Sequence, residues 1–389
     1  MSDALTVQST AAAFAKRWRE LEAEPDKRTP LSIAIVASFT VDTLVPYLGC
    51  FLAQRGVHAT FTLAPFGQIY QTLLDPGAPA RTADVTLVLP RLEDLCARPL
   101  AELARLDPER VAAARADAHA ELARLAGALA GYEAATAGTT IVGTLPAPPH
   151  TPLGVLDASH PASIAQLVRE ANVALWQTAH RARRLRIADV DAVIARLGAE
   201  RAWDPRMDLI AGCPLSSLAL RYLGEHLART IAPLVVSPAK VVVLDLDNTL
   251  WGGIVGEDGA NGIAIGTAGV GAAFTAFQDA LLALRAQGVL LAVASKNNEA
   301  DAFEVFDHHP AMRIRRDHLA AHRISWAQKS ESLRAIAAEL SLGVDSFVFL
   351  DDSPTECAEV RRVLPEVTVV QLPADPARYV EVLRAIPEL

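Results

Sequence analysis

Residues 241–259 read VVVLDLDNTLWGGIVGEDG. The four apolar residues that open this stretch, three of them β-branched, are typical of a strand buried on both faces of a parallel sheet. The run ends at two carboxylates, Asp245 and Asp247, one residue apart. Side chains two apart on an extended segment point the same way, so the pattern predicts that both acids reach one edge of the sheet.

Other apolar runs in the C-terminal half of the chain alternate with helical segments and predict a mostly parallel sheet. Three of the runs end in polar clusters, which are Asp245-Leu-Asp247, Ser295-Lys-Asn-Asn298 and Asp351-Asp352. Because the carboxyl ends of parallel strands face one crevice, these clusters should converge there. The strands expected in this half are 241–247, 288–295, 312–316, 346–352 and 366–372, with a helix over 271–287.

Carboxylates gathered at one strand edge repel each other unless a hard cation holds them, and oxygen ligands indicate Mg²⁺. We expect Asp245, Asp247 and Asp351 to be the metal ligands. Lys329, one of only five lysines in an arginine-rich chain, would add a compact positive charge, and Ser295 would offer a neutral donor to an anion. This combination is typical of phosphoryl transfer, in which Asp245 would be the nucleophile and Asp247 the acid/base.

In chain order, Asp245-Leu-Asp247-Asn248-Thr249, Ser295, Lys329 and Asp351-Asp352 resemble the four motifs of the haloacid dehalogenase (HAD) superfamily. The resemblance implies a Rossmann-like sheet, Mg²⁺ dependence, an aspartyl-phosphate mechanism, and phosphate contacts from Thr249, Ser295 and Lys329. The Trp-Gly-Gly sequence after the first motif is similar to the FkbH-like branch of that superfamily. Other segments that are similar to this branch are SKNNEADAFEVF, SWAQKSESLRAIAAELSLG and DSFVFLDDSPTECAEVRRVLPEV.

Membership of the FkbH-like branch implies a particular reaction. Its members take glyceryl from the acyl phosphate 1,3-bisphosphoglycerate, release phosphate, and load the phosphopantetheine thiol of an acyl carrier protein for polyketide-type biosynthesis. The family pattern often has a cysteine four residues before the nucleophile, where this chain has Val241. If the enzyme forms a thioester, it must use another thiol, Cys213 or Cys357, and the alternative role of both is packing in the core. Otherwise the acyl group passes directly to the carrier thiol.

The spacing of the motifs leaves room for only a minimal cap over the site. The segment between Thr249 and Ser295 is largely taken up by the expected helix, so a short flap remains. An open crevice suits an arm that enters from a partner protein. Trp251 either contacts substrate or anchors the flap, and Asn297 and Asn298 either orient phosphate or cap the following helix.

Residues 31–235 predict a second α/β unit, preceded by an N-terminal helix within 1–30 and followed by the HAD-like domain over 236–389. The segments VASFTVDTLVPYLG and AWDPRM are similar to the region before the FkbH-like domain. This region also faintly resembles SGNH-type esterases, which implies an SGNH/flavodoxin-like fold. Ser38 stands where such an esterase holds its nucleophile, and Asp157, His160 and Asp204 are its candidate partners. Met207 occupies the place where a DxxH pair would need histidine, which favours an inactive scaffold over a catalytic site. The expected strands are 31–39, 58–66, 83–91, 139–146 and 185–190.

The composition narrows the function classes. A net charge of -9 without any basic run argues against nucleic acid and acidic membranes as partners. The N-terminus lacks a secretory apolar core and no stretch is long enough to span a membrane, so we expect a cytoplasmic protein. Four scattered cysteines indicate neither a disulfide framework nor a zinc site. Two alternatives to glyceryl transfer remain, a phosphatase without acyl transfer and a non-catalytic scaffold that binds carrier proteins.

Overall fold

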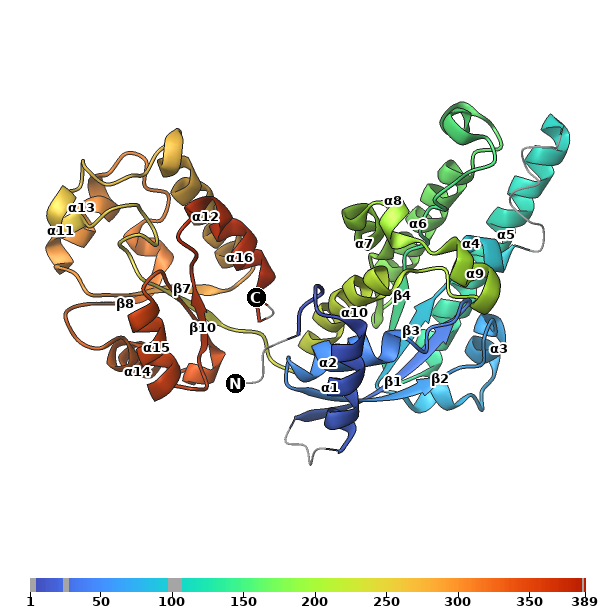
Figure 1. The fold of residues 1–389 in the computed structure, drawn as a ribbon, viewed down its shortest axis with the longest axis horizontal. Coiled ribbons are helices and arrows are strands. Elements are labelled where there is room, and N and C mark those ends of the chain that lie inside the picture. The colour runs from blue at the N-terminus through green and yellow to red at the C-terminus, as the bar shows by residue number, and fades with distance from the viewer. Residues whose placement is uncertain (1–4, 24–27, 97–106, 387) are drawn as a thin grey trace. The chain divides into compact units, whose positions relative to one another are not determined.

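The computed structural model describes residues 5–23, 28–96, 107–386 and 388–389. The chain divides into two compact units, Met1–Val236 and Ser237–Leu389, and each is built on a parallel five-stranded sheet (Figure 1). Both sheets are covered by helices, which confirms the expected α/β class. Among the described helices, none combines the length and the apolar character that crossing a membrane requires.

The C-terminal sheet has the strand order β10-β9-β6-β7-β8, and all of its pairs are parallel. The chain moves outward from β6 to β7 and β8, then returns to β9 on the other side of β6. The carboxyl end of β6 therefore lies at the switch point of the sheet, where ligands bind in open α/β folds. Its strands are β6 (Val241–Leu244), β7 (Leu290–Ser295), β8 (Leu319–Ile324), β9 (Phe347–Asp351) and β10 (Thr368–Gln371).

The opening strand is apolar throughout because both of its faces are covered. Val242 and Leu244 belong to a core that includes residues of α12, α13 and α16, whereas Val241 and Val243 pack with residues of α14 and α15. All four are completely buried, as expected for the central strand of a doubly covered sheet. The helices of this unit are α11 (Val255–Asp258), α12 (Gly269–Ala286), α13 (Glu299–His308), α14 (Lys329–Leu340), α15 (Pro354–Val363) and α16 (Tyr379–Ala385).

One expected strand of this unit was wrong. Residues 312–315 form a loop, the short 3₁₀ helix Arg316–His318 follows, and the edge strand is β8 after it. Met312 and Ile314 are buried, which explains the strand-like alternation, but the backbone N–H groups of Arg313 and Ile314 donate to the side-chain oxygen of Gln278 rather than to a strand. A buried side-chain amide thus satisfies the hydrogen bonds that a neighbouring strand would otherwise supply.

The N-terminal sheet has the order β2-β1-β3-β4-β5, the flavodoxin-like arrangement. Helices α1, α2, α7 and α10 contribute to the core on one face, and α3, α5 and α6 to the core on the other. The strands are β1 (Thr29–Ala37), β2 (Val57–Leu63), β3 (Val85–Leu89), β4 (Thr139–Gly143) and β5 (Leu185–Ala188). The helices are α1 (Ala11–Ala23), α2 (Leu44–Ala53), α3 (Ile69–Leu74), α4 (Leu92–Leu95), α5 (Pro108–Ala135), α6 (Ile164–Arg181), α7 (Val190–Leu197), α8 (Ala199–Ala202), α9 (Pro205–Ala211) and α10 (Ser217–Ile231).

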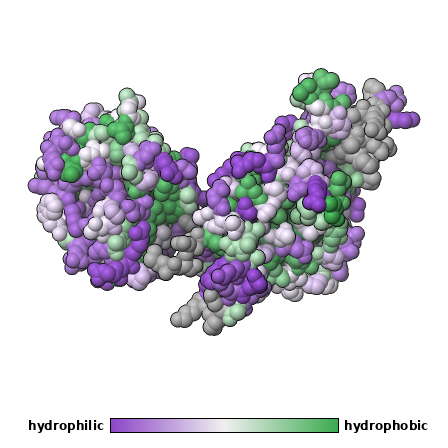
Figure 2. All heavy atoms as spheres, viewed as in Figure 1, coloured by the Kyte–Doolittle hydropathy of each residue, from purple (hydrophilic) through white to green (hydrophobic). Residues whose placement is uncertain are grey.

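Apolar side chains reach the surface of the N-terminal unit over the short 3₁₀ helix Gly154–Ser159 (Figure 2). Val155 is 97% exposed there, and Leu156 beside it is 68% exposed. Single exposed apolar residues are common on folded proteins, so this surface by itself indicates no function.

Candidate active site

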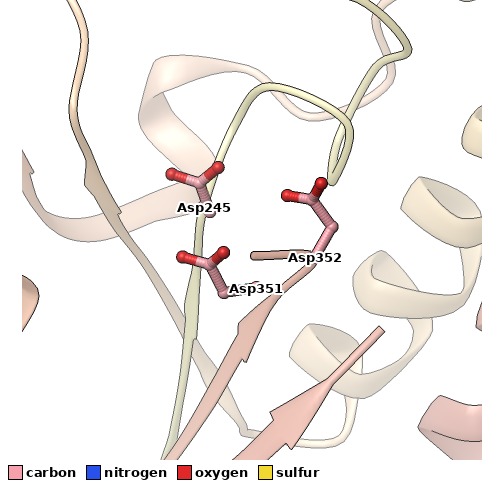
Figure 3. Close-up of side chains that lie close together, drawn as sticks. All are labelled: Asp245, Asp351 and Asp352. Carbon is pink, nitrogen blue, oxygen red and sulfur yellow. The ribbon is translucent and has the colours of Figure 1, made fainter. Parts of the chain in front are cut away.

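Three carboxylates meet at the ends of the neighbouring strands β6 and β9 (Figure 3). Asp245 directly follows β6, Asp351 ends β9, and Asp352 comes next. One oxygen from each carboxylate lies within 4.8 Å of the others. Asp351 is only 1% exposed and Asp245 8%, so water screens their mutual repulsion poorly.

Lys329 is the positive charge of this cluster. It is the first residue of α14 and is 2% exposed. Its Nζ donates to Asp245 Oδ1 and, at 2.7 Å, to the carbonyl oxygen of Ala294, and it lies 3.0 Å from Asp351 Oδ2. Burial opposes its charge, but the two carboxylates outweigh burial and raise the pKa of Lys329, so the side chain is an ammonium.

One ammonium does not balance three carboxylates. Burial and the nearby Asp245 carboxylate raise the pKa of Asp351 to about 6, and the same two causes raise the pKa of Asp352. Asp351 Oδ2, although close to the lysine, has no well-directed hydrogen bond, and the buried hydroxyl of Thr249 has none either. An oxygen-only donor set with unmet lone pairs fits a hard divalent cation held by Asp245, Asp351 and Asp352.

The side chain of Asp247 does not join this cluster, so the geometry favours Asp352 beside Asp245 and Asp351, and metal ligation by Asp247 remains a prediction. Its Oδ1 accepts hydrogen bonds from Trp251 Nε1 (2.9 Å) and the backbone N–H of Val255 (3.1 Å), and its Oδ2 accepts from Asn297 Nδ2 (2.8 Å). β6 ends at Leu244, so Asp245 and Asp247 both lie beyond the strand. The rule that alternate side chains point the same way therefore does not reach Asp247, and Asp352 takes the third place.

The Trp-Gly-Gly segment forms the base of a short flap. Trp251 is completely buried and packs edge-to-face on Phe306, so it anchors the flap and does not reach a substrate in the crevice. Gly252 forms an antiparallel bridge with Ala264. Gly253 has φ +96°, which favours glycine, and it donates its N–H to the side chain of Asn248.

The other expected phosphate ligands lie close to this edge but are poorly exposed. Ser295 ends β7 and is 3% exposed, while Thr249 is completely buried below the turn. Their contacts with phosphate remain predictions. Asn298 caps α13 by accepting the N–H of Ala300 at 3.0 Å, as one alternative expected. Asn297 instead binds Asp247, a role that the sequence did not indicate because the two residues are 50 positions apart.

An open crevice of about 710 Å³ begins beside Asp352 and Asn248. It lies between the flap, the first turns of α12 and the segment 371–379. The residues that line it include the apolar Val270 and Phe274 but no Lys, Arg or His. This part of the site therefore suits an uncharged, partly apolar chain better than an anionic group.

All four cysteines lie in the described part of the chain, and none belongs to the acidic cluster. Cys50, Cys213 and Cys357 are buried. Burial raises the pKa of Cys357 to about 12 and that of Cys96, which is half-buried, to about 11. None of these thiols is poised as a nucleophile.

The N-terminal unit has a different polar group at the carboxyl edge of its sheet. Ser38 Oγ donates to Asp94 Oδ2 at 2.7 Å and accepts the backbone N–H of Arg91 at 2.9 Å. The Arg91 guanidinium binds both Asp94 and Asp208. No histidine is among the partners that the described residues provide for Ser38.

The residues expected as partners of Ser38 have local structural roles. Asp157 accepts hydrogen bonds from Ser163 Oγ and from the backbone of Ile164 at the start of α6. His160 Nδ1 accepts a hydrogen bond from the N–H of Ala162. Asp204 caps α9, since its Oδ1 accepts a hydrogen bond from the N–H of Met207. The geometry agrees with a scaffold rather than a catalytic triad.

The strand orders define the class of this chain, which joins a flavodoxin-like α/β unit to a HAD-like α/β unit. No protein-family model matches the chain, and no curated protein does. A solved structure with the same two-unit architecture is the N-terminal part of the protein BF1531 from Bacteroides fragilis, which contains a phosphatase domain and is complexed with Mg. It is 27% identical, covers 95% of this chain and 96% of its own, and superposes with a TM-score of 0.82.

Two further structures match with a TM-score of only 0.30, too low to support an argument. They are a putative acylhydrolase from Bacteroides fragilis, which is 14% identical over 59% of this chain and 99% of its own, and a GDSL-like lipase from Bacteroides thetaiotaomicron, which is 11% identical over 58% of this chain and 100% of its own.

Proposed function

We propose that this protein is a Mg²⁺-dependent phosphatase of the HAD type, with Asp245 as its nucleophile. The observation that carries the proposal is the cluster of Asp245, Asp351 and Asp352 around one buried lysine at the switch point of the sheet. The likeness to a Mg-complexed protein with a phosphatase domain, over nearly the whole chain, supports it. Bound at the three carboxylates, Mg²⁺ would neutralise charge on the transferring phosphoryl group.

The chain's own groups account for both steps of hydrolysis. An Asp245 oxygen attacks phosphorus, the bond from phosphorus to the substrate oxygen breaks, and the electron pair leaves with that oxygen, which takes a proton from Asp247. Water then attacks the aspartyl phosphate, Asp247 accepts the water's proton, and Asp245 is regenerated as phosphate departs. Lys329 holds Asp245 in place and stabilises charge during both steps.

We further propose the FkbH-like reaction, in which 1,3-bisphosphoglycerate supplies a glyceryl group to the phosphopantetheine thiol of an acyl carrier protein. Attack of Asp245 on the acyl phosphate would release a free carboxylate and lose the activated acyl group. In a productive cycle the carrier thiolate therefore attacks the carbonyl carbon, the bond from that carbon to the phosphate oxygen breaks, and phosphate leaves with the electrons. Asp245 then removes the other phosphate, an alkyl ester whose leaving oxygen needs the proton of Asp247.

Two features favour direct transfer to an external thiol. The crevice beside Asp352 has no basic lining residue and suits the neutral pantetheine arm. The thiol of Cys357 contacts the backbone oxygen of Asp351 at 3.5 Å, but it is buried, and burial raises its pKa to about 12, so it is a poor nucleophile. Val241 lies completely buried at the far end of β6, about 13 Å of extended chain from Asp245. Because a residue at that end of the strand is far from the nucleophile, the valine there is a weak argument against transfer.

The test is to incubate the protein with 1,3-bisphosphoglycerate, Mg²⁺ and holo carrier protein, and to weigh the carrier by mass spectrometry. We expect a glyceryl mass gain with the holo carrier and none with the apo carrier, which lacks the thiol. In Asp245→Asn the carrier should instead gain the mass of a phosphoglyceryl group. The acyl phosphate is still lost in the transfer, but the variant can no longer remove the ester phosphate.

The rivals give other results in the same experiment. Phosphate release without any gain on the carrier would select a phosphatase without acyl transfer. If the protein releases no phosphate and the carrier gains no mass, the proposed enzyme is refuted. The non-catalytic scaffold that binds carrier proteins is then the remaining alternative.

A further inference from the structure

The Asp247 carboxylate is fixed by donors from two different segments of the C-terminal unit. Trp251 Nε1, in the flap, donates to Oδ1 at 2.9 Å, and Asn297 Nδ2, at the entrance to α13, donates to Oδ2 at 2.8 Å. We infer that Trp251 and Asn297 are positioning residues that aim Asp247 for proton transfer. This inference rests on the proposed function, in which Asp247 is the acid/base.

Both donors are held rigidly. The Trp251 side chain is completely buried and its ring packs edge-to-face on Phe306 of α13, with 6.0 Å between the ring centroids. Asn297 is 6% exposed and directly precedes the residue that caps α13. Hydrogen bonds in such poorly hydrated surroundings are strong and restrict the rotamers of all partners. Together with the backbone N–H of Val255, which also donates to Oδ1 at 3.1 Å, the two side-chain donors leave Asp247 one orientation.

This orientation decides between two roles for the same side chain. Asp247 lies two residues from Asp245, whose carboxylate belongs to the acidic cluster beside Lys329. With Mg²⁺ held by that cluster, an unrestrained carboxylate at this distance would be free to turn toward the cation, and an oxygen bound there would no longer exchange a proton. Trp251 and Asn297 keep it outside, where it can exchange a proton with a leaving group or water.

The test compares leaving groups in Trp251→Phe and Asn297→Leu, which remove the donors but keep much of the volume. The value of kcat/KM reports steps up to the first irreversible one, here departure of the leaving group. An alkyl phosphate such as 3-phosphoglycerate needs a proton at this step, whereas acetyl phosphate releases a carboxylate that does not. We expect kcat/KM to fall at least about tenfold with 3-phosphoglycerate and less than about threefold with acetyl phosphate, since general acid catalysis contributes 10²–10⁴-fold.

The neighbouring Asn298→Ala is the matched control, because it removes a helix cap and no contact to Asp247. It should lower both reactions equally, if at all. Equal losses with both substrates in Trp251→Phe and Asn297→Leu would show a merely structural role and overturn the inference.

A second readout does not depend on turnover. The indole N–H signal of Trp251, assigned by its disappearance in Trp251→Phe, should move in ¹H–¹⁵N spectra and exchange faster with solvent in Asp247→Ala. A signal that stays in place would refute the hydrogen bond and the inference with it. If the wild-type protein hydrolyses neither phosphate while this signal responds, the proposed function fails and the positioning geometry stands.

Discussion

The two units carry polar groups at the same edge of similar sheets, yet they balance charge differently. In the N-terminal unit, Arg91 binds two carboxylates, those of Asp94 and Asp208, and Ser38 completes the network. In the C-terminal unit, three carboxylates share the single ammonium of Lys329. In the first group, Ser38, Arg91, Asp94 and Asp208 pair with one another, and only the neighbouring Glu93 keeps a buried carboxylate oxygen without a hydrogen bond. The second group has three carboxylates for one ammonium in a nearly dry pocket.

The difference teaches where function lies in a protein with two similar scaffolds. Sheet order alone would permit a ligand at either switch point. A network whose donors and acceptors already pair with one another has nothing left to offer a ligand, while buried groups with unmet charge and unmet lone pairs require one.

Removing the central cation of each network should separate the two units most clearly. Lys329→Met leaves two buried carboxylates without their cation, which should lower the free energy of unfolding by about 3–5 kcal/mol and abolish phosphatase activity. Arg91→Met should cost about 1 kcal/mol, because its partners Asp94 and Asp208 are 24% and 38% exposed and water can replace the guanidinium. Hydrogen exchange of peptides from each unit measures the two losses separately. Equal losses would remove the contrast between the networks.

Metal binding should distinguish Asp352, which lies in the acidic cluster, from Asp247, which lies outside it. Asp352→Asn removes a carboxylate of the cluster and should weaken Mg²⁺ binding by tenfold or more, a change in binding free energy of at least about 1.4 kcal/mol. Asp247→Asn should leave the affinity within about threefold, because its side chain is already committed to Trp251 and Asn297. Titration calorimetry of the metal-free protein gives both values. The reverse pattern would restore Asp247 as the ligand expected from sequence.

A charge on the wall of the crevice should affect the carrier protein and spare hydrolysis. Val270 lines the crevice and is 53% exposed, so Val270→Asp should fold normally. Losing this apolar contact should raise the carrier concentration needed for half-maximal transfer about tenfold, the usual cost of disturbing one apolar contact. Phosphate release without carrier should not change. Val155→Asp, on the exposed surface of the other unit, is the matched control, and an equal effect of both would exclude this crevice as the acceptor site.

The sequence predicted the main features of the C-terminal unit for sound physical reasons. A fully apolar run such as 241–244 fits only a strand covered on both faces, and polar residues after such strands must collect at one edge. Asp245 and Asp351 were found in this way, Lys329 was found because lysine is rare in this chain, and the structure brings the three together.

The remaining details depend on contacts that a local pattern does not contain. The place of the Asp247 side chain outside the acidic cluster depends on its hydrogen bonds to Trp251, Val255 and Asn297. The edge strand β8 was missed because the buried residues of 312–316 imitate a strand, and the Gln278 side chain that satisfies this loop lies far away in the sequence.

The smallest effect is expected at Ser38, the residue that most resembles a nucleophile in the N-terminal unit. Ser38→Ala leaves the N–H of Arg91 without its acceptor, which should cost about 1 kcal/mol of stability. Ester hydrolysis, measured with p-nitrophenyl acetate, should be as low in the variant as in the wild type, and phosphate release should be unchanged. This follows because Asp94, and not a histidine, holds the hydroxyl, and a carboxylate that is itself paired with Arg91 is a weak base for activating serine. An esterase activity that disappears in Ser38→Ala would show that the network around Ser38 opens to accept a substrate. Unbalanced charge would then no longer predict which of the two sheet edges is an active site.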